Sequence, residues 1–138
     1  MIKLMSRHDA YAYRLNFPLS ATVTTLDEGT WLTLDANGEL VVSDGTAAVS
    51  FMAMSSKRSG RDNITPNGGE CTVLAGHFGC WTDKYNALAT FAATTTPLKI
   101  SATGTLDVWA SASDDAEEIV GYAIGAPTAD GLLRVLIK

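Results

Sequence analysis

The chain has 138 residues, a length that suits a single domain able to bury a hydrophobic core without disulfides or metals. Its net charge is −5 and its ten Lys and Arg residues are scattered, so a protein that binds nucleic acid directly is not expected. The chain contains neither the roughly 20 consecutive apolar residues of a membrane helix nor, near its start, the apolar core of a signal peptide. We therefore expect no membrane partner and synthesis in a cytoplasm.

Residues 1–20 are predicted to form an extended N-terminal arm. Aromatic and apolar side chains occupy every second position before Pro18, namely Tyr11, Tyr13, Leu15 and Phe17. An alternation of period two with aromatic residues is typical of an extended strand. Two interpretations stay open: an edge strand of the domain's own sheet, or an arm that docks on a neighbouring subunit. If it docks on a neighbour, we expect deletion of residues 1–15 to leave a folded domain that has lost its contacts.

Residues 21–138 are predicted to form one all-β domain, a compact β-barrel or β-sandwich. No window of twelve residues has helical periodicity, and short β-type segments recur about every eight to twelve residues between turns. Asn37-Gly38 between two apolar runs is a strong hairpin signal. The expected β segments cover residues 21–26, 30–34, 39–43, 47–54, 71–76, 96–101, 105–111, 118–125 and 132–138, with a break at 77–79 and a short segment of unassigned type at 80–85.

Residues 55–70 separate these segments as a long polar loop, rich in Ser, Gly and Asn. Long loops in compact domains are often functional. This loop also carries the chain's one small basic cluster, formed by Lys57, Arg58 and Arg61.

One stretch of the sequence occurs twice. The run from Leu32 to Val42 aligns with the run from Leu98 to Val108, 66 positions later, with apolar residues and a turn glycine in the same places. Val49-Ser50-Phe51 then aligns with Val120-Gly121-Tyr122. Either two similar β units build one domain, or two unrelated hairpins share the pattern that any hairpin favours. The repeated residues are those of a core and a turn, and none can perform acid–base or nucleophilic chemistry.

The candidates for chemistry are few. Cys71, His77 and Cys80 form a C-x5-H-x2-C pattern, which could give zinc ligands, a Cys–His pair or a disulfide. A structural zinc site needs four ligands and His8 is the one His or Cys left, so the sequence favours two small buried cysteines instead. The acidic run that begins at Asp114 lacks the pattern of a calcium loop and is expected to be a solvated link. We therefore expect no enzyme, no cofactor and no metal.

The tryptophans suggest another possibility. Trp31, Trp81 and Trp109 could, with Tyr85, form a stacking surface for sugar rings. Tryptophan in a strand more often lies in a core or an interface, which we expect for Trp31 and Trp109. We expect Trp81 to be the exposed one.

The order of these features resembles the small capsid cement, or decoration, proteins of tailed bacteriophages. The resemblance covers residues 20–138 and rests on TWLTLDANGELVVSDGTAAVSFMAM, CTVLAGHFGCW, TPLKISATGTLDVW and EIVGYAIGAPTADGLLRVLIK. In that family a unit with a turn glycine opens the domain, a P-L-x-apolar unit begins its second half, and a D-G-x-apolar-x-V strand closes it.

The resemblance implies a β-tulip-like domain that binds the outer surface of an assembled head and clamps neighbouring subunits of the major capsid protein. It implies localisation on the virion after synthesis in the host bacterial cytoplasm, and self-association, with a homotrimer slightly favoured over a dimer. The expected contact residues are Tyr11, Tyr13, Arg14, Phe17, Lys57, Arg58, Arg61 and Trp81. The alternatives are another virion component, such as a tail tube or the base of a head fibre, and a carbohydrate-binding β-sandwich module.

Overall fold

The computed structural model of the chain describes residues 2–4, 12–47, 49–54 and 70–138, and in this part the fold is all-β. Sheet A contains, in spatial order, β1 (Ile2–Leu4), β7 (Phe78–Thr82), β11 (Leu133–Ile137), β10 (Gly121–Ile124), β8 (Thr95–Ile100) and β9 (Leu106–Val108). Sheet B contains β2 (Ala12–Pro18), β6 (Glu70–Gly76), β5 (Phe51–Ala53), β3 (Trp31–Leu34) and β4 (Leu40–Val42). The helical part of the described residues is one 3-10 turn, η1 (Ala116–Glu118). The predicted all-β fold class is thus confirmed.

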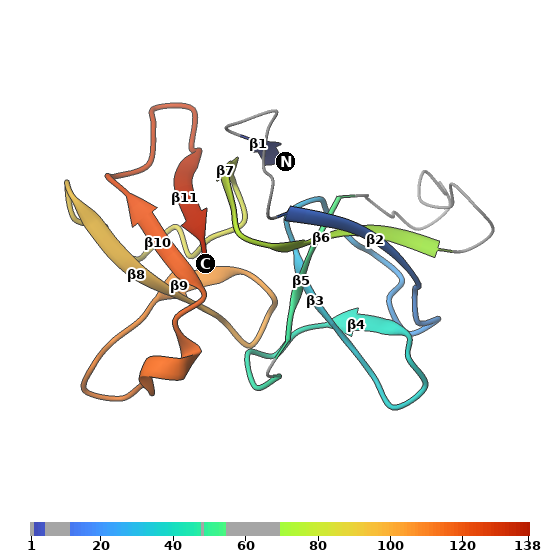
Figure 1. The fold of residues 1–138 in the computed structure, drawn as a ribbon. Coiled ribbons are helices and arrows are strands. Elements are labelled where there is room, and N and C mark those ends of the chain that lie inside the picture. Colours follow the sequence, from blue (N-terminus) through green and yellow to red (C-terminus); the bar gives the residue numbers. More distant parts are fainter. Residues whose placement is uncertain (1, 5–11, 48, 55–69) are drawn as a thin grey trace.

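The two sheets lie side by side and share one core (Figure 1). Sheet B contributes the buried side chains of Trp31, Met52 and Leu74 to this inter-sheet core. Sheet A contributes its inner face, formed mainly by Cys80, Leu98, Leu106, Ala123, Leu133 and Val135. We call the opposite side of sheet A its outer face.

Sheet B also has a second apolar face, which points away from sheet A. It carries a second core cluster built around Leu32, Leu40, Phe51 and Val73. Val23 and Leu26 cover this cluster from the connection between β2 and β3. The strand predicted for residues 21–26 is therefore wrong. The segment turns at Ser20, whose carbonyl accepts a hydrogen bond from the Val23 amide at 3.0 Å, and it contains a single β-bridge residue, Leu26, in place of a strand.

The repeat seen in the sequence is present in the structure. Leu32 lies opposite Val42 and Leu34 opposite Leu40 in the first hairpin. Leu98 lies opposite Val108 and Ile100 opposite Leu106 in the second, so each pair recurs 66 positions later. The turn hydrogen bonds also recur: Gly38 N donates to Asp35 O, and Gly104 N to Ser101 O, both at 3.1 Å.

The repeat extends to a third and a fourth strand. β3 pairs with β5 and β5 with β6, as β8 pairs with β10 and β10 with β11. The alignment of Phe51 with Tyr122 is wrong by one residue, because Phe51 lies opposite Leu32 whereas Gly121 lies opposite Leu98. By pairing, Phe51 therefore corresponds to Gly121, and Met52 corresponds to Tyr122. Because side chains alternate between the two faces of a strand, this shift of one residue places Tyr122 on the face equivalent to that of Met52.

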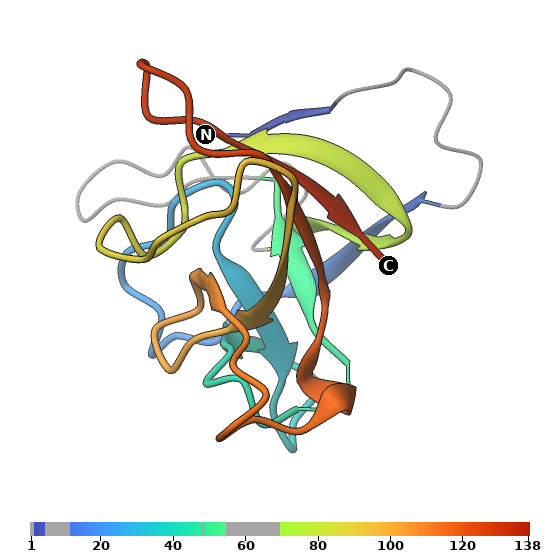
Figure 2. The same ribbon diagram turned by 90° about the vertical axis from the view of Figure 1, so that its left-hand side faces the viewer.

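The chain passes from one sheet to the other between β6 and β7, which Figure 2 shows as one curved yellow-green ribbon. Gly76, with φ of 95°, ends β6 at this passage. β2 pairs with β6 along all seven of its residues, so it is an edge strand of sheet B within the same chain. The division into an arm of residues 1–20 and a barrel of residues 21–138 stays a prediction.

Candidate functional site

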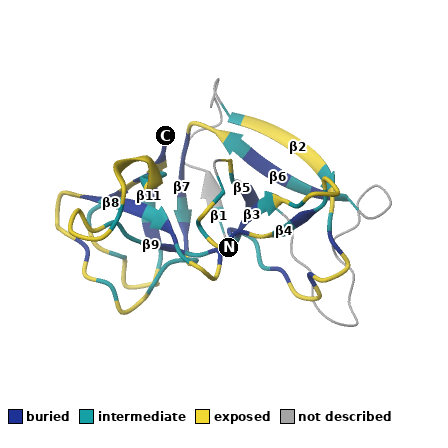
Figure 3. Cartoon of the chain, turned by 90° about the horizontal axis from the view of Figure 1, so that it is seen from below, coloured by how far each residue is buried: buried dark blue, intermediate teal, exposed yellow. Residues whose placement is uncertain are grey.

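β2 presents one of two candidate contact surfaces. Figure 3 shows β2 exposed over most of its length beside the buried β6. Tyr13 is 63% exposed and Arg14 is also exposed, so both predicted contact residues are accessible. Phe17 differs, because its ring packs against Phe51 with 5.3 Å between centroids and belongs to the second core cluster. Of the other predicted contact residues, Tyr11, Lys57, Arg58 and Arg61 lie outside the described residues.

Trp81 does not have the exposure that the sequence suggested. It lies on the outer face of sheet A, directly opposite Arg134 of β11. The guanidinium carbon of Arg134 stands 5.8 Å from the centre of the indole ring, a cation–π arrangement that leaves Trp81 half-buried. Trp81 thus forms part of an aromatic and cationic surface, while its ring face towards Arg134 is already occupied.

The outer face of sheet A forms the second candidate contact surface. Pro97, Tyr122 and Leu136 lie in one row across β8, β10 and β11. Tyr122 is 38% exposed and Leu136 is 46% exposed, whereas their neighbours Ala123 and Val135 on the inner face are fully buried. Large apolar side chains therefore gather on a sheet face that no described part of the chain covers.

The sequence analysis missed Tyr122 and Leu136, although a signal was present. In the last segment, LLRVLIK, apolar residues occupy both the odd and the even positions, so both faces of the strand are apolar. EIVGYAIG likewise has apolar residues on both faces. A strand with one buried face usually alternates apolar with polar residues. Apolar residues on both faces indicate either a strand buried on both sides or a surface for contact.

The acidic run lies at the surface, as expected of a solvated link, and it is also held by specific hydrogen bonds. Asp114 accepts a hydrogen bond from Lys99 at 2.7 Å and one from the Ala110 amide at 2.8 Å. The hydrogen bond from Lys99 lowers the pKa of the Asp114 carboxyl below its ordinary value and raises the pKa of Lys99. Glu118 accepts a hydrogen bond from the Asp115 amide at 2.9 Å, which holds η1 in place. These contacts fix the link between β9 and β10.

Cys71 and Cys80 are outside any disulfide and both are buried, as the sequence favoured. Cys71 belongs to the second core cluster and Cys80 to the inter-sheet core, so the two thiols lie in different cores and form no disulfide. Burial raises the pKa of Cys71 to about 11, which makes it a poor nucleophile at neutral pH. Among the described residues, no group of three or more His, Cys, Asp or Glu side chains is arranged to hold a metal ion.

The second aromatic ring expected in a sugar-binding surface is occupied by contacts within the chain. Tyr85 packs edge-on against Phe91, with 5.6 Å between ring centroids, and lies against the inter-sheet core. Its hydroxyl donates to the carbonyl of Gly131 at 3.1 Å. Trp81 and Tyr85 therefore do not offer a pair of free rings.

Comparison of the chain with protein-family models, with curated proteins and with solved structures found no match. In the part of the chain that the structure describes, no helix is long and apolar enough to cross a membrane.

Proposed function

We propose that the protein is a structural component of a bacteriophage virion, which binds the outer surface of the assembled head and holds neighbouring major capsid subunits together. The resemblance of residues 20–138 to phage cement proteins is one support for this function. The fold adds a second support, because large apolar and aromatic side chains suited to protein contact are accessible on β2 and on the outer face of sheet A.

The observation that carries this function is a comparison of the two repeated sheets. In sheet B the side chains of Trp31, Met52 and Leu74 dock on another β-sheet and are buried there. The corresponding positions of sheet A are Pro97, Tyr122 and Leu136, which form one row on the outer face; Tyr122 and Leu136 are exposed and Pro97 is half-buried. The same unit thus uses one face for burial within the chain and leaves the equivalent face accessible. Exposed apolar faces of this kind mark interaction surfaces.

Head stabilisation would then follow from mass action. A protein that binds only the assembled shell lowers the free energy of that state by its own binding free energy. A specific contact of this kind buries on the order of 800 Å² on each partner. Many copies, each touching two or more subunits, would raise the barrier to rupture of the shell.

The test is cryo-electron microscopy of purified expanded heads that lack this protein, with and without the recombinant chain added back. We expect regular new density on the outer surface, with the outer face of sheet A or β2 turned towards the capsid. The same maps count the copies at each position and so test the proposed homotrimer. Absence of added density at saturating protein would contradict head decoration, and density at the tail would favour a tail component.

A further inference from the structure

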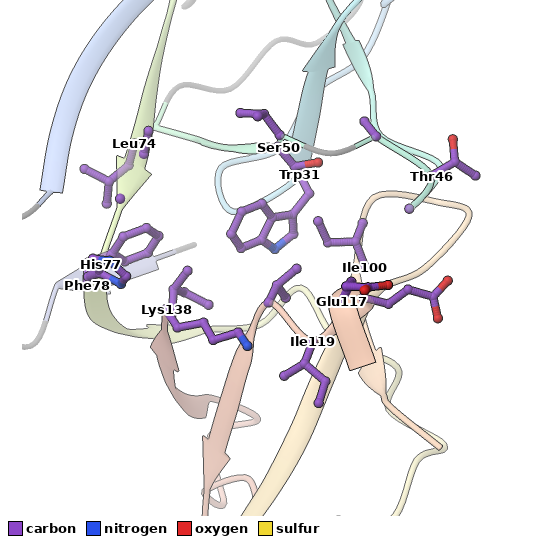
Figure 4. Close-up of a pocket in the computed structure, with 18 of the residues that line it drawn as sticks. Trp31, Thr46, Ser50, Leu74, His77, Phe78, Ile100, Glu117, Ile119 and Lys138 are labelled. Atoms are coloured by element: carbon purple, nitrogen blue, oxygen red, sulfur yellow. The ribbon is translucent and has the colours of Figure 1, made fainter. Parts of the chain in front are cut away.

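A cavity of about 610 Å³ opens between the two sheets, at the end where the chain passes from β6 into β7 (Figure 4). Its walls come from the start of β3, the connection before β5, the β6–β7 passage, the ends of β8 and β11, and η1. Its apolar lining includes Leu74, Phe78, Ile100, Ile119, Val120 and Ile137. This volume lies within the range of about 300–1,000 Å³ that is typical of ligand-binding sites.

The cavity exists because β5 and β6 separate there. Their pairing consists of Met52 with Leu74 and Ala53 with Val73, whereas β6 pairs with β2 as far as Gly76. Among the described strands, none pairs with Ala75 or Gly76 on the side of β5, and both residues line the cavity. An extended peptide can add to a strand edge of this kind through main-chain hydrogen bonds.

Trp31 provides a hydrogen-bond donor inside the cavity. The side chain is only 3% exposed and its indole lies in the middle of the site in Figure 4. Its Nε1–H group is buried and has no hydrogen-bond partner among the described residues. A buried donor without a partner is unfavourable, so an acceptor such as a peptide carbonyl that reaches it would bind at a favourable position.

The charge at the cavity wall selects for a cation. Asp115, Glu117 and Glu118 stand on one side, against Lys138 and the exposed His77 on the other. Glu118 is already bound to the Asp115 amide. The Glu117 carboxylate makes no hydrogen bond or ion pair with the described residues, so it can receive the side chain of a Lys or Arg.

We propose that this cavity binds an extended peptide segment of another protein, in which an apolar side chain lies near a Lys or Arg. The apolar side chain fills the space between the sheets and a main-chain carbonyl accepts the hydrogen bond of Trp31 Nε1. The basic side chain pairs with Glu117, and the main chain adds to the edge at Ala75–Gly76. These contacts do not depend on head binding, which is a separate proposal.

The test uses the full chain with ¹⁵N-labelled tryptophan, whose three indole N–H signals are followed by NMR. The Trp31 signal is assigned by its loss in Trp31→Phe. The probe is a library of capped pentapeptides that carry two apolar residues and one Lys in every arrangement, with Ser elsewhere. A matched library carries Glu in place of Lys. We expect the Lys library to shift the Trp31 signal and to leave unchanged that of Trp81, which lies on the outer face of sheet A away from the cavity. Trp109 is no control, because its indole N–H donates to the carbonyl of Asp115 in the cavity wall at 2.8 Å.

Two variants test the assigned roles. Glu117→Gln lies at the surface and should weaken binding of the selected peptide about two- to fivefold, the range of an exposed ion pair. Asp130→Asn removes an exposed carboxylate outside the cavity and should leave the affinity unchanged. Equal shifts from the Lys and Glu libraries, or no shift of Trp31 from either, would overturn the proposal. Because this experiment contains no phage head, its result is independent of the result of the head-binding experiment.

Discussion

Gly38 and Gly104 occupy the same position in the two repeated turns, with φ of 74° and 73°, but their surroundings differ. A Cβ atom on Gly38 would meet nothing within 4 Å. On Gly104 it would lie 2.8 Å from the carbonyl oxygen of Trp31 and 2.7 Å from Val42. Gly38→Ala should therefore lower the free energy of unfolding by about 1 kcal/mol, the cost of a left-handed conformation for a residue with a side chain. Gly104→Ala should cost roughly 1–3 kcal/mol more, because the second hairpin must move away from β3.

Urea unfolding of both variants beside the wild type measures this difference. Both variants introduce the same backbone strain, whereas the steric clash of the new Cβ atom occurs at Gly104 alone. Comparing the two variants therefore separates the strain from the clash. Equal losses at the two sites would contradict the close contact between the second hairpin and sheet B.

Cys71 should make the stability of the fold fall at alkaline pH. The unfolded chain releases the thiol proton near pH 9, whereas burial raises the pKa of Cys71 in the folded protein to about 11. Between these values the unfolded state loses the proton first, so stability is full below about pH 9 and decreases as the pH rises towards 11. The full decrease is roughly 3 kcal/mol, since the pKa differs by about two units at about 1.4 kcal/mol each, and about 2 kcal/mol of it is reached by pH 11. Urea midpoints from pH 7 to 11 measure it, and Cys71→Ala should remove this part of the pH dependence.

At the scale of elements, the strands could be predicted well where local pattern and pairing agree. Asn37-Gly38 correctly placed the first hairpin, and the repeated apolar positions placed the second. Residues 21–26 were predicted as a strand because their β-branched composition fits a half-buried surface. Composition does not reveal whether a segment pairs with a sheet or covers its face. Val23 and Leu26 satisfy the same apolar pattern by covering the second core cluster.

β2 gives an element-scale prediction in which the structure argues against the expectation from sequence. Deletion of residues 1–15 removes β1 and four of the seven pairs between β2 and β6. It also removes Ile2, which packs against the inter-sheet core. We expect a loss of several kcal/mol in unfolding free energy, because each ladder hydrogen bond contributes roughly 1 kcal/mol net. Urea unfolding with circular dichroism detection measures the loss.

The matched control keeps the strand and changes its exposed side chains. Tyr13→Ser with Leu15→Ser leaves the main-chain pairing intact and should change the unfolding free energy by about 1 kcal/mol at most. A truncated chain as stable as the wild type would instead show that residues 1–15 are dispensable for the fold, as expected of an arm that docks elsewhere.

At the scale of the whole molecule, the sequence indicated accessible residues on β2 but did not locate the outer face of sheet A or the cavity between the sheets. Tyr13 and Arg14, named from the sequence as contact residues, are both accessible in the structure, although as neighbours in a strand they point to opposite faces of β2. The sequence could not identify the outer face of sheet A, because Tyr122 and Leu136 read as ordinary core residues until the pairing register is known. Nor could it find the cavity beside Trp31, which arises where two strands 20 residues apart in sequence separate. Such features depend on how the two repeated sheets pack, and local pattern contains no information about that packing.

The outer face leads to the prediction that joins fold and function. Tyr122→Ser with Leu136→Ser removes the two exposed apolar side chains whose equivalents in sheet B dock on another sheet. If this face contacts the capsid, affinity for expanded heads should fall at least tenfold, since each large apolar side chain contributes roughly 1.5–3 kcal/mol when buried and 1.4 kcal/mol corresponds to a factor of ten. Co-sedimentation of the protein with purified heads over a concentration series measures the affinity. Leu88→Ser is the matched control, because Leu88 is 95% exposed and lies in a connection outside this face. Unchanged binding of the double variant, with the wild type bound, would move the contact from sheet A to β2.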